Sequence, residues 1–210
     1  MIGLHQFSLF LVAATLLAIA PGPGMLYVLA RTLAGGRREG VLSSLGTFFG
    51  GLVHVVAAAC GLSLVLATSA LAFATVKYAG AAYLVYLGVR MILSARRDDA
   101  VEIPVTSQPG RTNPFWHGIV TEVLNPKTAI FFLAFIPQFV NRGGGVFWQF
   151  LGLGSISVAL NTTCDLIVTL AAAPIGERLR SSAVLRRRQR TLTGLTLIGL
   201  GASVAVSDAR

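Results

Sequence analysis

The residues best suited to chemistry are ionisable side chains embedded in apolar sequence. Lys127 follows Asn125 and Pro126 inside a long hydrophobic run, Glu122 precedes them by about one helical turn, and Asp165 lies in a second such run. A charged side chain at the centre of a membrane costs about 2.5–3.5 kcal/mol on insertion scales, so such residues usually pair or line a path. The pattern indicates recognition of a charged small molecule, or proton transfer, within a membrane.

Asn125 and Pro126 form a helix-start signal in the middle of this run. Asparagine is a favoured N-cap, and proline is favoured at the first helical position. A helix that restarts here turns backbone N–H groups and a positive dipole end toward whatever faces it, and Lys127 adds a full positive charge. We therefore predict that Asn125, Pro126 and Lys127 bind a substrate carboxylate. The alternative is a kink, with the lysine paired to an acid.

Residues 21–24 (PGPG) interrupt the first hydrophobic run. Each proline removes an N–H and clashes with the carbonyl four residues earlier, and the glycines permit backbone angles that other residues avoid. Such backbone survives in hydrocarbon only when it is buried in protein or lines a cavity. We predict a broken helix in which Pro21, Gly22, Pro23 and Gly24 help to bind the substrate. A simple kink without a ligand is the alternative.

Other polar side chains could complete the site. Glu122 and Asp165 could carry protons, bind an ammonium group or neutralise the lysine. His54 titrates near neutral pH and could relay protons, but a neutral histidine held by packing fits equally well. Two further residues could line the same cavity, Tyr83 and Asn161.

These residues must be positioned by membrane-spanning helices. Of the 210 residues, 54% are hydrophobic and 12% are charged, about half the charged fraction of a soluble domain. A span needs about 20 mostly apolar residues. The sequence predicts an all-α integral membrane protein with six transmembrane helices, at about 7–30, 41–67, 71–93, 115–140, 146–173 and 192–206, with spans one and four broken.

Basic residues are divided unevenly between the two faces that these spans define. When Arg90, near the end of the third span, is counted with the adjacent face, thirteen of the 17 fall on one face, two on the other and two within spans. Because basic loops stay in the cytoplasm, both termini are predicted to lie outside. The net charge of +9 therefore reports sidedness and contact with membrane lipid, and does not indicate binding of nucleic acid.

The chain is predicted to form one transporter domain, 1–210, made of two halves. A polar, turn-rich cytoplasmic linker, 95–114, separates 1–94 from 115–210. Three spans in each half would give an inverted repeat, as in many transporters. Residues 50–62 align with 154–166 at a glycine, a cysteine and a leucine. Gly46 and Gly50 permit close helix contact within one chain or between two copies, so a homodimer stays open.

Motifs that would indicate other chemistry are missing from the sequence. It has no GxxxxGK[ST] phosphate loop, no HExxH and no GxSxG, so neither ATP-driven transport nor these enzyme classes are supported. No cofactor or metal is implied. A membrane-embedded enzyme and a non-transporting membrane scaffold are the alternatives to a transporter.

The ordered motifs resemble those of the lysine exporter (LysE/RhtB) family of amino-acid translocators. They extend over nearly the whole chain, at 21–24 (PGPG), 50–54 (GGLVH), 61–62 (GL), 77–84 (KYAGAAYL), 86–88 (YLG), 124–127 (LNPK), 131–132 (FF) and 137–139 (PQF).

This resemblance implies efflux of amino acids or related metabolites across the bacterial inner membrane, driven by the proton gradient. It also implies that six residues match family motif positions: Pro21, Gly22, Pro23, Asn125, Pro126 and Lys127. The stretch 161–165 (NTTCD) departs from the family, where more apolar residues are expected. The substrate is not indicated.

Overall fold

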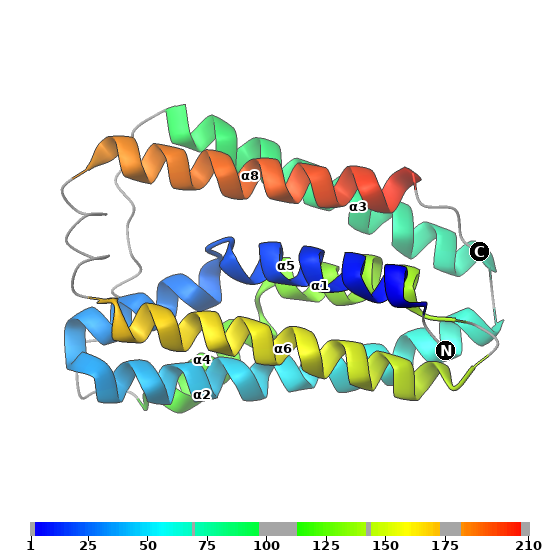
Figure 1. The fold of residues 1–210 in the computed structure, drawn as a ribbon, viewed down its shortest axis with the longest axis horizontal. Helices are drawn as coiled ribbons and strands as arrows, with labels where there is room; N and C mark the ends of the chain where they lie inside the picture. The colour runs from blue at the N-terminus through cyan, green and yellow to red at the C-terminus, as the bar shows by residue number, and fades with distance from the viewer. Residues whose placement is uncertain (1–2, 69, 97–112, 142–143, 173–181, 207–210) are drawn as a thin grey trace.

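The computed structural model describes residues 3–68, 70–96, 113–141, 144–172 and 182–206, and every regular element in these ranges is helical. The helices run alongside one another along the long axis of the molecule (Figure 1). The predicted all-α class is therefore confirmed. Most of the predicted linker 95–114 lies outside the described residues.

The first half contains α1 (Leu4–Ile19), α2 (Pro23–Thr68) and α3 (Ala70–Arg96). The polypeptide leaves helical geometry at 20–22, as the PGPG stretch predicts.

α2 is kinked at Gly36, where φ is +79°. This left-handed backbone favours glycine because other residues would strain there. An ion pair of 3.1 Å joins Arg31 to Glu39 across the kink. The predicted connection between the first two spans is therefore helical on both sides of Gly36, where the helix is kinked.

The second half begins with α4 (Pro114–Val123) and α5 (Pro126–Ile130), and continues through a π-helix, η1 (Phe131–Phe135), and a 3-10 helix, η2 (Ile136–Phe139). The two parts of this predicted fourth span are bent by 45° at residues 124–125.

The last described helices are α6 (Val146–Leu170) and α8 (Ala183–Val206). The sixth predicted span, which begins at residue 192, lies within α8, whose apolar part is residues 190–206. The arginine-rich turns before it favour helix, but they are not apolar, so a search for hydrophobic segments does not include them.

Two helical stretches among the described residues are long and apolar enough to cross a membrane, Pro23–Gly61 and Val146–Leu170. The bent pair formed by Pro114–Val123 and Pro126–Phe139 would be a third if it is one span. Leu4–Ile19 and residues 190–206 are apolar but shorter. The count of six spans therefore stays a prediction.

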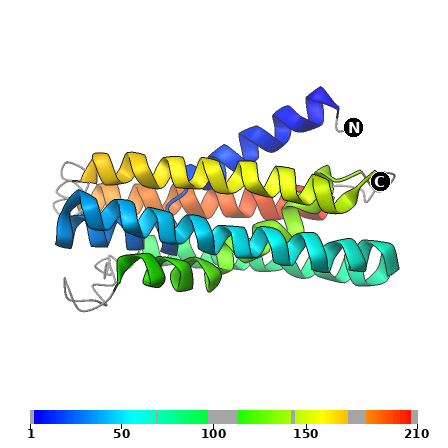
Figure 2. The same ribbon diagram turned by 90° about the horizontal axis from the view of Figure 1, so that it is seen from below.

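The helices pack in two groups. α2 packs on α4 and α6, whereas α3 packs mainly on α8. In Figure 2, α1 diverges from the other helices toward its N-terminal end. A Cβ on Gly46 would lie 2.2 Å from the Phe115 carbonyl oxygen and one on Gly50 2.7 Å from that of Ile119, so both glycines let α2 approach α4. These contacts are within one chain.

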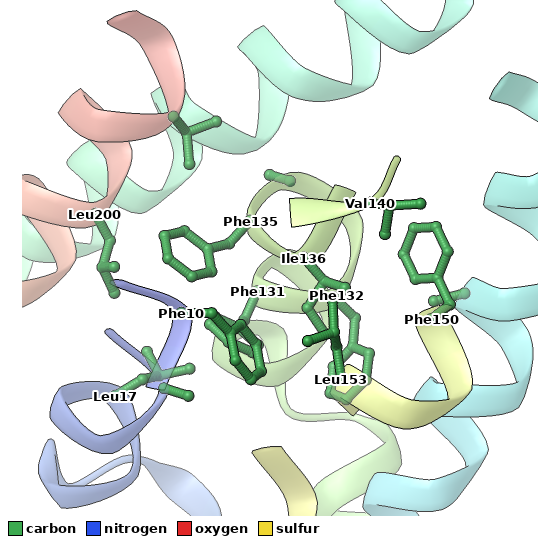
Figure 3. Packing of buried hydrophobic residues seen from close by; sticks show 14 of the residues in the cluster. Phe10, Leu17, Phe131, Phe132, Phe135, Ile136, Val140, Phe150, Leu153 and Leu200 are labelled. Carbon is green, nitrogen blue, oxygen red and sulfur yellow. The ribbon is translucent and has the colours of Figure 1, made fainter. Parts of the chain in front are cut away.

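The apolar core lies where α1, the η1–η2 segment, α6 and α8 meet (Figure 3). Phe10 of α1 and Phe150 of α6 are completely buried, and stacked rings of Phe131 and Phe135 lie between them and α8. This core fixes η1 directly beyond the break in the fourth predicted span, and so positions the residues at that break.

Candidate functional site

Each helix break contains a proline, and in each case a side chain from elsewhere binds a carbonyl to which that proline cannot donate. In a continuous helix, residues 21 and 126 would donate to the carbonyls of Leu17 and Glu122, but Pro21 and Pro126 have no N–H. Lys127 binds the first carbonyl and His54 the second. The two breaks are therefore joined through hydrogen bonds that span much of the chain.

Lys127 is buried and its ammonium group lies at the C-terminal end of α1. Nζ donates to the Leu17 carbonyl at 2.7 Å and to the Ala20 carbonyl. Two of its three N–H groups are thus used. Within the described part of the chain, no carboxylate oxygen lies within 4 Å of this nitrogen. A direct ion pair with an acid, one of the predicted alternatives, is not formed.

Asn125 caps α5 as predicted. Its Oδ1 accepts from the Lys127 backbone N–H at 3.1 Å, and Pro126 occupies the first turn. Its Nδ2 donates to Oε2 of Glu122 at 3.0 Å. The Lys127 N–H is therefore already engaged and is not available to a ligand, so the positive character of this break comes from the lysine side chain.

Glu122 is held from both sides. Oε1 accepts from the Thr128 hydroxyl at 2.6 Å, and Oε2 accepts from Asn125. A Cβ on Gly24 would lie only 2.3 Å from Oε2, and one on Gly22 would lie 2.8 Å from Cδ of Lys127. Both glycines thus make room for charged side chains.

From the sequence, Gly22 and Gly24 are expected to supply unusual backbone angles. Among the described residues, positive φ occurs only at Gly36. The prediction that Gly22 and Gly24 supply unusual backbone angles is therefore wrong, and close approach explains them instead.

His54 lies against the break between α4 and α5. Its Nε2 lies 2.9 Å from the Glu122 carbonyl oxygen, and its ring stacks on Phe132 at 6.0 Å. Because a carbonyl oxygen only accepts, Nε2 carries the hydrogen. The Glu122 carbonyl also accepts from the Asn125 backbone N–H at 3.0 Å, so His54 adds a second hydrogen bond at this break. The contact fits a histidine held by packing, and a proton relay through His54 stays a prediction.

Asp165 of α6 is completely buried against α2. Its Oδ2 lies 2.9 Å from the Thr47 hydroxyl, and its Oδ1 has no hydrogen-bond partner among the described residues. Asp165 and Glu122 therefore have different surroundings although both are buried acids.

A cavity of about 20 Å³ is lined by residues of α1, α2, α4, α5, η1 and α6. Its polar lining residues are Thr47, Glu122, Lys127, Thr128, Ser157 and Asn161. This volume holds about one water molecule, so the cavity is too small for an amino acid.

The predicted site residues are only partly brought together at this cavity. Asn161 lines it as predicted, whereas residues 21–24 lie behind Lys127 and Glu122 rather than in its wall. Tyr83 is exposed on α3 with its ring beside Tyr86, and is not among the lining residues.

Sequence reasoning missed the hydroxyl groups. Thr47, Thr128 and Ser157 are buried or half-buried around the acids and the cavity. A threonine in a helix commonly bonds its own backbone, as Thr32 does here, so its presence in an apolar run is a weak signal. Thr128 could have been found, because it lies in the first turn after the Asn125 cap.

Comparison with known proteins identifies the family. The model described as LysE type translocator matches residues 15–208. The chain belongs to the LysE type translocator family. The resemblance stated from the motifs is thus confirmed.

Relatives of this translocator are also membrane or efflux proteins. An uncharacterized membrane protein of Bacillus subtilis is 29% identical, over 97% of this chain and 100% of its own. The homoserine/homoserine lactone efflux protein of Salmonella typhimurium is 31% identical, over 81% of this chain and 80% of its own. No solved structure matches. The translocator is therefore a membrane protein of a family that moves small molecules.

Proposed function

We propose that this translocator is a secondary exporter of amino acids or related small metabolites across the bacterial inner membrane, driven by the proton gradient. The observation that carries the proposal is the position of the Lys127 side chain. Its ammonium group is buried and held by two carbonyls of α1, and its side chain lines the cavity. A membrane protein keeps such a charge where it meets a ligand or a path.

Lys127 is the residue that we assign to the substrate carboxylate. Two of its N–H groups are fixed by backbone carbonyls, which leaves the third for an anion. Because the cavity holds about one water molecule, the substrate needs a more open conformation. Alternating access supplies one, when one half of a transporter rocks against the other.

The membrane topology is part of the proposal. Six spans with both termini outside would place the basic loops in the cytoplasm. The first helix of each half ends at Ile19 and Val123, which are 104 residues apart (123 − 19). The same offset (154 − 50) aligns Gly50 with Gly154. Matched breaks at a matched offset support an inverted repeat.

The packing supports the same arrangement. The second and fifth predicted spans lie in α2 and α6, which pack together, and the third and sixth lie in α3 and α8, which also pack together. In an inverted repeat, a twofold axis in the membrane plane exchanges the two halves. It would exchange α2 with α6 and α3 with α8, so each packed pair would be mapped onto itself.

Homoserine is the first substrate to test, because a 31% identical relative carries it in its name. Purified protein in sealed proteoliposomes, loaded with radiolabelled homoserine and then with other amino acids, should release substrate when a pH gradient is imposed. Lys127→Met should abolish release. Lys77→Met is the matched control, since this second buried lysine does not line the cavity.

The alternatives predict different results. A membrane-embedded enzyme would form product in detergent without any gradient. A scaffold would move no substrate, and its function would survive Lys127→Met. Normal release by a well-folded Lys127→Met variant would refute the carboxylate role.

A further inference from the structure

The two buried acids differ in how their oxygens are satisfied. Both oxygens of Glu122 accept hydrogen bonds, one from the Asn125 amide and one from the Thr128 hydroxyl. An amide NH₂ only donates, so Oε2 must be an acceptor. This arrangement suits an ionised carboxylate, which accepts at both oxygens.

Asp165 is in the opposite situation. It is 0% exposed, and Oδ1 has no partner among the described residues. Oδ2 has one neighbour, the hydroxyl of Thr47. A buried carboxylate with an oxygen that accepts no hydrogen bond is unfavourable, because burial of a charge is costly unless it is paired and hydrogen-bonded.

The Thr47 hydroxyl indicates where a proton lies. It is 2.9 Å from Asp165 Oδ2 and 3.0 Å from the Ser44 carbonyl oxygen. A hydroxyl has one hydrogen, so it cannot donate fully to both acceptors. If Oδ2 carries a proton, Asp165 donates to Thr47 and Thr47 donates to Ser44, and both bonds are formed.

We propose that Asp165 is the carboxyl group that takes up and releases the coupling proton, and that Thr47 passes this change to the cavity. This inference rests on the proposed function. On release, the proton passes from Oδ2 to water, and the resulting carboxylate accepts the Thr47 hydrogen. The Ser44 carbonyl then loses its side-chain donor.

Thr47 connects Asp165 with the cavity. It lines the cavity, which has room for about one water molecule, and it contacts Asp165. The charged groups that act on Asp165 are Glu122 of α4 and Lys127 of α5, and Cys164 is the titratable neighbour on its own helix. Loss of the proton therefore changes both the Thr47 hydrogen bond and the charge facing Lys127.

Infrared spectroscopy of the purified full chain in lipid tests the protonation directly, without a substrate. At neutral pH the wild type should show a protonated-carboxyl band, which Asp165→Asn removes and Glu122→Gln leaves in place. Thr47→Val should shift this band to higher frequency, because the acid loses its acceptor, and Thr47→Ser should restore it. Thr163→Val, which removes an exposed hydroxyl of α6, should change nothing.

Transport assays distinguish a defect in proton coupling from a defect in substrate binding. In proteoliposomes with radiolabelled homoserine, Asp165→Asn should retain exchange across the membrane without a gradient and lose stimulation by a pH gradient. If the wild type moves no homoserine, that substrate assignment fails, and the infrared result alone decides the role of Asp165.

Two results would overturn the inference. One is a band that is absent from the wild type or that disappears in Glu122→Gln. The other is Asp165→Asn with normal gradient stimulation. If Asp165→Asn fails to fold, the variants Thr47→Val and Thr47→Ser still test the inference. An unshifted band in Thr47→Val would exclude the hydrogen bond on which the inference depends.

Discussion

Replacement of Gly24 by alanine should destabilise the translocator, although alanine is the better helix former. The new Cβ would lie 2.3 Å from Oε2 of Glu122 and 3.6 Å from Nδ2 of Asn125. The carboxylate must therefore move. It is held by Asn125 and Thr128, so the movement breaks or weakens these bonds.

The size of the effect follows from three contributions. A hydrogen bond to a charged group is worth about 1.5–3 kcal/mol, and overpacking of a filled site costs about 1–3 kcal/mol. Alanine offsets these by up to about 1 kcal/mol through its helix propensity. The net loss is about 3 kcal/mol, which lowers Tm by roughly 6–12 °C for a protein of this size.

Thermal unfolding in detergent measures this loss. Gly61→Ala is the matched control, because Gly61 lies in the same helix and a Cβ there would meet nothing within 4 Å. We expect Gly61→Ala to unfold at or slightly above the wild-type temperature. If Gly24→Ala is as stable as this control, Glu122 is not fixed against Gly24, and the close-approach explanation of the PGPG stretch is wrong.

Two further substitutions test the neighbouring contacts. Asn113→Ala removes an exposed cap that precedes a proline and should cost about 1 kcal/mol; Asn125→Ala removes the same kind of cap and a donor to Glu122, and should cost about 3 kcal/mol. Equal melting temperatures would contradict the bond to the acid. His54→Phe should cost about 1 kcal/mol and retain gradient-driven transport, and loss of the gradient response with exchange intact would instead show that His54 relays protons.

Much of the fold could be predicted from the sequence, because it follows from local chemistry. Long apolar runs predict helices, and prolines at 21 and 126 predict the two breaks, since they lack N–H groups whatever surrounds them. α8 begins at Ala183, before the predicted span at 192, because the turns that precede the span are helical without being apolar. A connection between the first two spans was predicted, but its helical structure on both sides of Gly36 was not, because the charged residues there give no sign of a helix.

The candidate site was only partly predictable. Placing an ionisable side chain in a membrane costs free energy, so such residues are rare and usually functional. Glu122, Lys127 and Asp165 could therefore be named from the sequence. Their partners could not. Thr47 is 118 residues from Asp165 along the chain, and Leu17 is 110 residues from Lys127.

From the sequence alone it follows that both helices break, that Asn125 restarts the second one, and that three charged residues lie in apolar surroundings. The packing of the helices places the lysine on carbonyls at the PGPG break and gives both oxygens of Glu122 a hydrogen-bond donor. The same packing leaves one oxygen of Asp165 without a partner among the described residues. The physical reason is that a missing N–H is a local covalent fact. Which group replaces it, and which acid lacks a donor, depends on how distant helices pack.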